Sequence, residues 1–483
     1  MKALRAILLL IVLPAVALAH VGSKDVYQEV TAGPYKLFVT IRMPNVIPGV
    51  ANVEVRSTGA AVSAISITPI PIVGEASKHP PTPDAMKVST ADTAFYTGGV
   101  WMMSSGSWQI RLDIAGAAGD LTTSVPVPAV AVATLKMQRD LGIPLALLGL
   151  FLLITMAGVV AAAVREARLP PGEPVSPSRR RRSLVAASGS LVFLGICVWG
   201  GAKWWNAEAS TYSAGIYRPP IVDVTLTGNR LSLHVPALED DHRWREPSNA
   251  TLIPDHGKII HLYAIREPQM DAAFHLHPEF DGVKHFRMEL PEMPPGDYGL
   301  YGDIVHANGF PETLTAHLKI PAGMSGTALA PDDASALPAP LSQGQLGTSY
   351  KLPDGYRMVW DRPSVITANT AYAFRFHLLK PDGSPATDMQ PYLGMAGHAA
   401  FVKTDGTVFA HTHPEGSAAM PAVMLANGMD AGMTMPSEPI TNIVEFPYGF
   451  PKPGAYRIFI QMKHGDPYKP GVVEAGVFDA TVQ

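Results

Sequence analysis

Apolar and polar residues alternate along the first part of this chain of 483 residues. Between Trp108 and Ile114 every second residue is apolar, which is the period of a β-strand that buries one face. Residues 35–43 and 52–56 show the same period, and no helical period appears before residue 142. We therefore predict a small β-sandwich over residues 20–135.

Two later segments are almost uniformly apolar. Residues 142–164 and 183–202 contain no charged side chain, and about 20 such residues are enough to cross a bilayer. We predict that both are transmembrane helices. The connecting loop, residues 165–182, ends in the arginine run Arg179–Arg182. Because cytoplasmic loops are rich in lysine and arginine, this basic loop is predicted to be cytoplasmic.

The N-terminus has the pattern of a signal peptide. Lys2 and Arg5 precede an apolar run, and Ala17-Leu18-Ala19 has the small residues of a cleavage site. Cleavage there removes residues 1–19 and leaves His20 as the first mature residue, whereas the alternative is an uncleaved anchor. With the basic loop inside, the sequence predicts a bacterial inner-membrane protein whose N- and C-terminal domains lie in the periplasm.

The chain after the second apolar segment contains an internal duplication. Two stretches share four blocks in one order: Pro-x-x-Gly-x-x-x-His, His-x-His-Pro-Glu, Pro-Gly-x-Tyr, and a histidine ten residues after that last glycine. A shared order of four blocks predicts two similar sandwiches, over residues 218–321 and 348–482. Residues 322–347 are rich in Ala, Pro, Gly and Ser and are predicted to be a linker. The predicted fold is thus mainly β: three immunoglobulin-like β-sandwich domains with two transmembrane helices between the first and second.

Each repeat has four histidines in these blocks. Two histidines separated by one residue point to the same side of a strand, and the last histidine ends a strand whose alternation turns it inward. Neutral imidazole is a ligand for copper, zinc, iron and nickel. We predict that at least three of the four rings converge in each repeat on a metal. The alternative is that the rings stabilise the fold by bonding to backbone carbonyls. The predicted ligands are His261, His275, His277 and His306 in the first repeat, and His398, His411, His413 and His464 in the second.

The second repeat is longer than the first by 22 residues between the His-x-His-Pro and Pro-Gly-x-Tyr blocks. Thioether sulfur favours Cu(I), although methionine also fills irregular gaps in a core. Beside paired histidines, a run of methionines favours copper as the cofactor. The insertion contains Met420, Met424, Met429, Met433 and Met435.

Residues 20–135 resemble the small periplasmic sandwich domains of the CopC, YtkA and FixH type. The resemblance rests on the start at His20, on Gly33-Pro34-Tyr35 at the start of a strand, and on the segment 101–108. In CopC-like copper carriers, an N-terminal histidine chelates the metal through its amino group and its imidazole, with another histidine and an acid. The resemblance therefore implies a copper role for His20, with His79 as the second histidine of the domain. The alternative is that any residue may follow a cleavage site.

The duplicated region, roughly residues 218–482, resembles exported or membrane-attached bacterial proteins of uncharacterised role that carry a repeated His-x-His-Pro motif. This resemblance implies membership of a family but no activity.

Composition narrows the function further. The net charge is -4 without a basic stripe, so we expect no nucleic acid partner. The single cysteine, Cys197, lies in an apolar segment, which excludes an intramolecular disulfide. No cofactor motif and no Ser/His/Asp or Cys/His arrangement is present, so we predict that the protein is not an enzyme.

We predict a membrane-anchored periplasmic protein that handles or senses copper through its histidines. The expected partners are the lipid bilayer and a periplasmic or membrane protein. One alternative is a structural scaffold of a membrane complex, in which the histidines serve the fold only. Another is an oxidoreductase acting at a histidine-bound metal.

Overall fold

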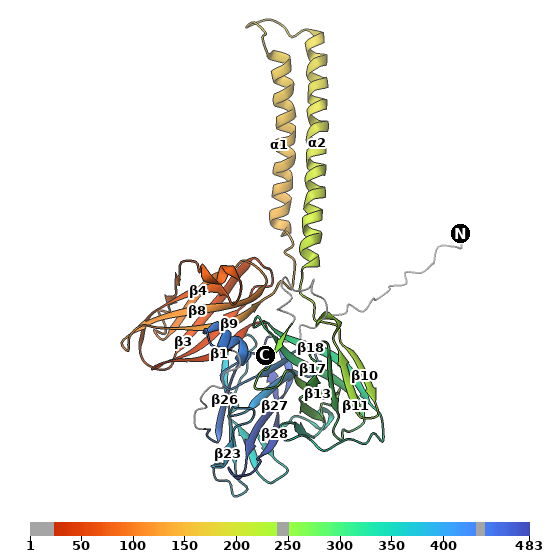
Figure 1. The fold of residues 1–483 in the computed structure, drawn as a ribbon. Coiled ribbons are helices and arrows are strands. Elements are labelled where there is room, and N and C mark those ends of the chain that lie inside the picture. The colour runs from red at the N-terminus through yellow and green to blue at the C-terminus, as the bar shows by residue number, and fades with distance from the viewer. Residues whose placement is uncertain (1–23, 239–250, 431–439) are drawn as a thin grey trace, which may run out of the picture. The chain divides into compact units, whose positions relative to one another are not determined.

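The computed structural model describes residues 24–238, 251–430 and 440–483. The predicted signal peptide, residues 1–19, and His20 therefore lie outside the described residues. The described chain is mainly β, with six antiparallel sheets and three α-helices (Figure 1). It divides into two compact units, of which one spans residues 130–218 and the other contains the chain before and after that segment.

The first domain consists of two sheets, and its strands include the three segments that the alternation predicts. Residues 108–114 lie in β8, with Ile110 and Leu112 fully buried between exposed or half-buried neighbours. Residues 35–42 form β2, and residues 52–56 lie in β3. One sheet has the order β1 (Val26–Ala32), β2 (Tyr35–Arg42), β3 (Gly49–Ser57), β7 (Phe95–Met102), β6 (Lys87–Val88), and the other β5 (Asp84–Ala85), β4 (Val62–Pro71), β8 (Gly106–Gly116), β9 (Leu121–Ala129).

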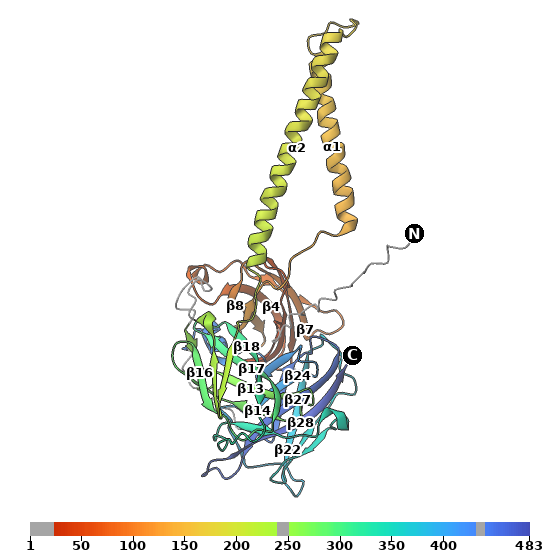
Figure 2. The ribbon, with the colours of Figure 1, turned by 90° about the vertical axis from the view of Figure 1, so that its right-hand side faces the viewer.

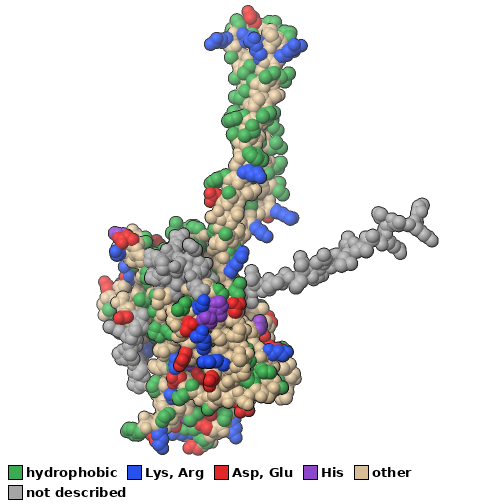
Figure 3. Space-filling view, turned by 45° about the vertical axis from the view of Figure 1, so that its right-hand side comes forward, with side chains coloured by type: hydrophobic (Ala, Val, Ile, Leu, Met, Phe, Trp, Pro, Cys, Tyr) green, Lys and Arg blue, Asp and Glu red, His purple; other side chains and the backbone are tan. Residues whose placement is uncertain are grey.

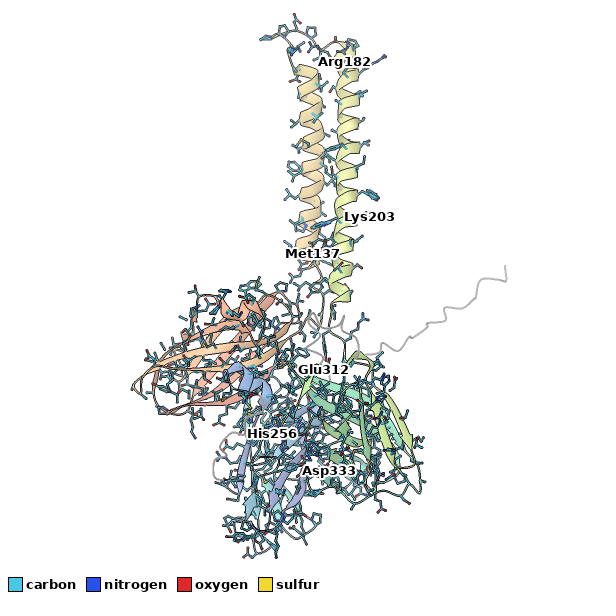
Figure 4. The ribbon with its side chains drawn as sticks, in the orientation of Figure 1. Met137, Arg182, Lys203, His256, Glu312 and Asp333 are labelled. Atoms are coloured by element: carbon cyan, nitrogen blue, oxygen red, sulfur yellow. The ribbon has the colours of Figure 1, made fainter. Side chains whose placement is uncertain are left out.

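The second unit is a pair of helices that are long and apolar enough to cross a membrane. α1 (Arg139–Glu166) contains the predicted span 142–164, and α2 (Pro177–Ala214) contains the predicted span 183–202. Hydrophobic side chains cover the surface of the pair, and Lys and Arg side chains gather where the two helices are joined (Figure 3). Arg182 lies at this end, whereas Lys203 lies toward the other (Figure 4). The run of four arginines, residues 179–182, makes the joined end the more basic one, which suits the predicted orientation.

The two repeats have corresponding main sheets. In the first repeat this sheet has the order β12-β17-β13-β14-β19 with β18 beside β17, and in the second β23-β27-β24-β25 with β28 beside β27. Both long central strands have eleven residues and end in a histidine. A histidine also starts the neighbouring strand, where His261 pairs with Asp303 in the first repeat and His398 pairs with Gln461 in the second. The strands are β12 (Leu252–Ile253), β13 (His261–Glu267), β14 (Ala273–Leu276), β17 (Gly296–His306), β18 (Pro311–Ile320) and β19 (Ala334–Ala336), then β23 (Met389–Gln390), β24 (His398–Lys403), β25 (Phe409–Thr412), β27 (Gly454–His464) and β28 (Val472–Val482).

Each repeat covers its main sheet with a smaller four-stranded sheet. In both repeats the tyrosine of the Pro-Gly-x-Tyr block donates a 2.8 Å hydrogen bond to the carbonyl four residues before it, from Tyr298 to Pro294 and from Tyr456 to Lys452. This shared contact fixes the start of the long central strand. The smaller sheets are β10 (Asp223–Thr227), β11 (Arg230–His234), β16 (His285–Glu289), β15 (Glu279–Phe280), and β20 (Ser349–Lys351), β21 (Arg357–Trp360), β22 (Tyr372–Leu379), β26 (Ile443–Tyr448).

The repeats pack against each other through the outer faces of their main sheets. Both views place β13 beside β27, and Figure 2 also shows β14 beside β24 (Figures 1 and 2). Tyr263 and Tyr301 of the first repeat share one apolar cluster with Phe409 and Phe459 of the second. The strands are therefore buried on both faces, and β24 has five consecutive buried residues. The alternating pattern that we used for the repeats predicts one buried face, so it did not reveal this contact.

A buried ion pair reinforces the contact between repeats. The fully buried Arg457 makes two hydrogen bonds to Asp479, of 2.7 and 2.8 Å, within the second repeat. The same guanidinium donates to the carbonyl oxygens of Met270 and Ala339, each at 2.9 Å. Residues 322–347 connect the repeats but are not a free linker, because β19 pairs with β14 inside this predicted linker.

Candidate metal centre

Seven histidines meet where the two repeats pack together. Their neighbouring rings lie 4.5 to 5.9 Å apart between centroids, and the labelled His256 marks their position (Figure 4). Four of the seven belong to the buried polar residues of the described chain, and the side chains of the other three are no more than 8% exposed. The cluster consists of His256, His261, His275 and His277 from the first repeat and His398, His411 and His413 from the second.

The sequence blocks place these rings by local geometry. His275 and His411 lie on β14 and β25, where they face Tyr263 and Ala400 of the neighbouring strands. His277 and His413 follow two residues later and therefore point to the same side. The Pro-x-x-Gly block forms a two-residue turn, closed in the first repeat by hydrogen bonds of 2.8 and 2.9 Å between Asp255 and Lys258.

Both central residues of this turn have positive φ, which explains the glycine of the block. In the first repeat they are His256 (φ 50) and Gly257 (φ 79), and in the second Leu393 (φ 52) and Gly394 (φ 82). The turn precedes the strand that carries the first histidine of the repeat. It thus places the side chain of His256 against His398 and His413 of the other repeat.

Two groups of three ring nitrogens have the spacing of ligands to one ion. His256, His398 and His413 form the first group, and in each group one nitrogen per residue lies within 4.8 Å of the others. The second group is His261, His275 and His411. Because a zinc–nitrogen bond is about 2.0 to 2.1 Å long, two nitrogens bound tetrahedrally lie roughly 3.3 Å apart. The 3.1 Å between Nδ1 of His261 and Nε2 of His275 is close to that value.

This pair of nitrogens has no proton to share when both rings are neutral. Nε2 of His261 donates to the carbonyl of Asp255 at 3.1 Å, and Nδ1 of His275 donates to Oε1 of Gln461 at 2.8 Å. The single N–H of each neutral imidazole is therefore used, and two lone pairs face each other. A cation between them removes this repulsion, whereas a purely structural contact does not.

Other rings are oriented in the same manner by an oxygen on the far side. Nδ1 of His277 lies 2.9 Å from Asp333, and Nδ1 of His411 lies 3.3 Å from Asp303. In both rings Nε2 is buried and has no hydrogen-bond partner. One nitrogen held by a carboxylate or carbonyl and the other left free is the arrangement of metal-binding histidines. Asp303 and Gln461, which correspond between the repeats, each orient a histidine of the other repeat.

The remaining rings have the largest number of unpaired nitrogens. Both nitrogens of His398 and of His413, and Nε2 of His256, are buried without a hydrogen-bond partner. Each unpaired buried polar group costs about 1 to 3 kcal/mol, so a fold that needed these side chains only for packing would be more stable with apolar ones. The unpaired nitrogens therefore favour a ligand over a structural role.

Burial keeps the rings in the neutral form that binds metals. Loss of hydration lowers the pKa of His256 to about 4, and the pKa of His261, His275 and His398 falls well below its ordinary value for the same reason. Burial also raises the pKa of Asp255 to about 7. Because the rings are neutral, they carry no positive charges that would repel one another, and the nitrogens can lie close together.

One cavity approaches the cluster from outside. It has a volume of about 480 Å³ and is lined by His277 and Asp333, with Lys258 and Asp332 beside them. The last two form a 2.9 Å ion pair. The ring of His277 lies 4.5 Å from that of His275, between centroids. This side of His277 is therefore an approach to the centre from solvent, and Asp333 marks it in Figure 4.

The structure does not bring every predicted ligand together. We expected one site in each repeat with His306 or His464 as its fourth ring, but the repeats share one cluster and those two residues are outside both groups of three. Nε2 of His306 lies 3.2 Å from Glu312, which is labelled in Figure 4, and Nε2 of His464 lies 3.1 Å from Asp354. Each stands at the end of a long central strand, three residues beyond Asp303 or Gln461, so the same alternation carries it away from the cluster.

In the first domain, His79 is 76% exposed and lies 3.7 Å from the exposed Glu75. It belongs to neither histidine group. His20, its expected partner, lies outside the described residues. Of the copper site expected in this domain, the structure therefore describes one surface histidine beside one carboxylate.

Sequence reasoning missed His256, because we aligned the repeats by their shared residues and this position differs between them. The signal was present, since a histidine in the turn stands where the second repeat has Leu393. It also missed Asp303, Gln461 and Asp333, which hold rings from other strands or from the supposed linker. Only the docking of the repeats identifies them.

The methionine insertion contains helix α3 (Met420–Ala426). Met424 is buried, and Asn427 at the end of this helix bonds to the backbone of Ser124 in the first domain at 2.9 and 3.0 Å. The backbone of Met420 lies against Asp255, next to His256. Met433 and Met435 lie outside the described residues. The insertion thus packs a buried methionine and touches the residue next to His256 through its backbone.

Residues 350–477, about a quarter of the chain, match a family model described as a domain of unknown function, DUF8832. No curated protein matches the chain. A solved structure of a 1.5-MDa bacterial ice-binding adhesin is 8% identical, with 94% of this chain and 99% of that chain covered and a TM-score of 0.16. Dimeric latent PorU from Porphyromonas gingivalis is 10% identical, with 95% and 34% covered and a TM-score of 0.15. Likeness at these TM-scores carries no argument about fold or function.

Proposed function

We propose that the two repeats together form a copper centre and that the protein holds copper at the periplasmic face of a bacterial inner membrane, for transfer or for sensing. The observation that carries the proposal is the convergence of seven buried histidines with nitrogens that lack hydrogen-bond partners. Two groups of three nitrogens provide room for two ions in one centre.

Copper fits this ligand set best among the ions that imidazole binds. The groups contain nitrogen ligands alone, and Cu(II) has the highest affinity of the divalent first-row ions for a given site. The methionine insertion carries soft sulfur that suits Cu(I), and the backbone of its Met420 bonds to Asp255. Zinc is the competing ion, and the experiment below separates the two.

Holding the metal is favoured over catalysis by the shape of the site. The rings are buried, and of the seven histidines His277 is the one that lines the described cavity. A centre reached past a single histidine suits slow capture and release of an ion. The helix pair would keep this centre at the membrane, with the basic connection of α1 and α2 in the cytoplasm.

For the first domain we propose the copper role that its resemblance to CopC-like carriers implies, with His20 as a ligand. We also propose that all three β-domains have immunoglobulin-like topology. The scaffold alternative explains the shared core of the repeats and the Arg457 ion pair, but it leaves the unpaired nitrogens of the cluster without a role.

The test uses the full chain in detergent micelles. His398→Leu with His411→Leu removes one ligand from each group of three while roughly keeping side-chain volume. The wild type, stripped with a chelator and reloaded, should bind about two equivalents of copper more tightly than zinc, with imidazole nitrogens visible in its electron paramagnetic resonance spectrum. The double variant should lose this binding.

The matched control is His234→Leu with His285→Leu. These two rings stack at 4.9 Å and lie beside Asp223 and Asp281, outside the cluster. The control should bind copper like the wild type. Equal copper binding by all three proteins, or none by the wild type, would contradict the proposal and favour the scaffold.

A further inference from the structure

A second group of possible ligands lies in the second repeat, at the end of β27. Nε2 of His464 is 3.1 Å from Oδ2 of Asp354 and 3.8 Å from Oε2 of Glu474. The three atoms lie within 4.8 Å of one another. One nitrogen and two carboxylate oxygens form a different ligand set from the nitrogen-only cluster.

Two of these atoms are buried without a hydrogen-bond partner, namely Nε2 of His464 and Oε2 of Glu474. Their side chains are 4% and 8% exposed, and Asp354 is 31% exposed, so the group is open on one side. A buried imidazole and a buried carboxylate that face each other at 3.8 Å without a hydrogen bond are costly unless a cation joins them.

The surroundings hold the ring in place and add negative charge. Tyr356 stacks on His464 at 4.0 Å, and its hydroxyl donates to Oδ2 of Asp388 at 2.7 Å. Asp388 also accepts from the backbone of the residue after His464 at 2.8 Å, through its carbonyl. Lys380 lies 4.0 Å from Asp388.

The first repeat provides an internal comparison. His306 ends β17 as His464 ends β27, and Glu312 lies on the paired strand opposite Ile304, as Glu474 lies opposite Met462. There the carboxylate and ring are 3.2 Å apart and hydrogen bonded. Both repeats thus contain a histidine–glutamate pair, but the two side chains are hydrogen bonded only in the first repeat.

The difference comes from the hairpin β20–β21, which precedes β22. Asp354 lies at its turn, where Oδ1 accepts from the backbone N–H of Tyr356 at 3.0 Å. This contact leaves Oδ2 directed at His464. The corresponding strands of the first repeat, β10 and β11, are joined by a short turn at Gly228 and Asn229 without an acid.

We infer that Asp354, His464 and Glu474 form a separate site for a divalent first-row cation of borderline hardness, with Zn²⁺ as its representative. Imidazole with carboxylates suits zinc, and three protein ligands leave a fourth position for water on the side of Asp354. The site is independent of the copper centre in residues and in ligand chemistry.

The experiment titrates Zn²⁺ into the full chain in micelles, in the His398→Leu/His411→Leu background that disables the histidine cluster. About one equivalent should bind, with nitrogen and oxygen but no sulfur in its X-ray absorption spectrum. Glu474→Gln should weaken binding by about tenfold or more, and so should Asp354→Asn at the exposed turn, where folding is not at risk. The matched control, Glu312→Gln in the first repeat, should leave zinc affinity unchanged.

Zinc binding that survives Glu474→Gln and Asp354→Asn, or that falls equally in Glu312→Gln, overturns the inference. Failure of the copper proposal would give a different result in this titration, because the wild type and the cluster variant would then bind the same single zinc ion. Thermal unfolding of each metal-free variant separates a lost site from a lost fold.

Discussion

Replacing His256 by leucine separates a ligand from a structural residue, because the protein already contains the variant. Leu393 occupies the same turn position in the second repeat with φ 52, against φ 50 for His256. The backbone therefore accepts leucine at this turn. Imidazole and the leucine side chain also have similar volume, so the substitution changes chemistry more than packing.

The structure predicts opposite effects on the two forms of the protein. Without metal, leucine removes the unpaired Nε2, whose nearest acceptor is Asp255 at 3.4 Å. Relief of that burial gains about 1 to 3 kcal/mol, less about 1 kcal/mol for the lost hydrogen bond to the Leu393 backbone. The metal-free variant should therefore be more stable than the wild type by about 1 kcal/mol.

With copper the order should reverse. Loss of one of three ligands should weaken the site by about 100-fold, since outer partners of metal ligands alone contribute 10- to 100-fold. At equal excess copper this removes about 2.7 kcal/mol of the stabilisation that binding gives. The loaded His256→Leu protein should then be less stable than the loaded wild type by roughly 2 kcal/mol.

The assay is denaturant unfolding of the full chain in micelles, followed by near-ultraviolet circular dichroism, with chelator and with copper. His317→Leu is the control, since its ring is 84% exposed and outside the cluster. A His256→Leu protein that is destabilised equally in both conditions, with unchanged copper affinity, would refute the reasoning and make His256 a structural residue.

Three further predictions follow from the same contacts. Asp303→Asn should weaken copper binding by about 10- to 100-fold in a competition titration because it orients a ligand ring, whereas the exposed Asp297→Asn on the same strand should not. Arg457→Met should lower the free energy of unfolding by about 3 to 5 kcal/mol, because it leaves a buried carboxylate uncompensated; a change under 1 kcal/mol would show that the ion pair does not clamp the repeats. The metal-free protein should lose stability as pH falls from about 6.5 to 4, because the unfolded chain takes up protons that His256 and the other buried rings refuse. The raised pKa of Asp255 acts in the opposite direction but is a single group; stability that rises on acidification would contradict the burial of neutral rings.

Local patterns predicted the parts of the fold that depend on neighbours in sequence. The period of residues 108–114 gave a strand with one buried face, and the uncharged segments gave helices, because each pattern is a property of a few consecutive residues. The paired histidines also follow from period two alone. The alternation could not show which outer face would be covered, since strands buried on both sides, such as β24, read as apolar runs.

The site depends on that missing information. A duplicated sequence predicts the same four histidines twice, and the simplest interpretation gives each copy its own site. The structure instead joins the two copies through crossed contacts, with Asp303 on His411 and Gln461 on His275. Neither contact has a signature along the chain, because the partners differ in type and lie more than a hundred residues apart. Where the copies differ, as at His256, the difference itself indicates the shared site, since one half supplies a ring that the other half does not need to repeat.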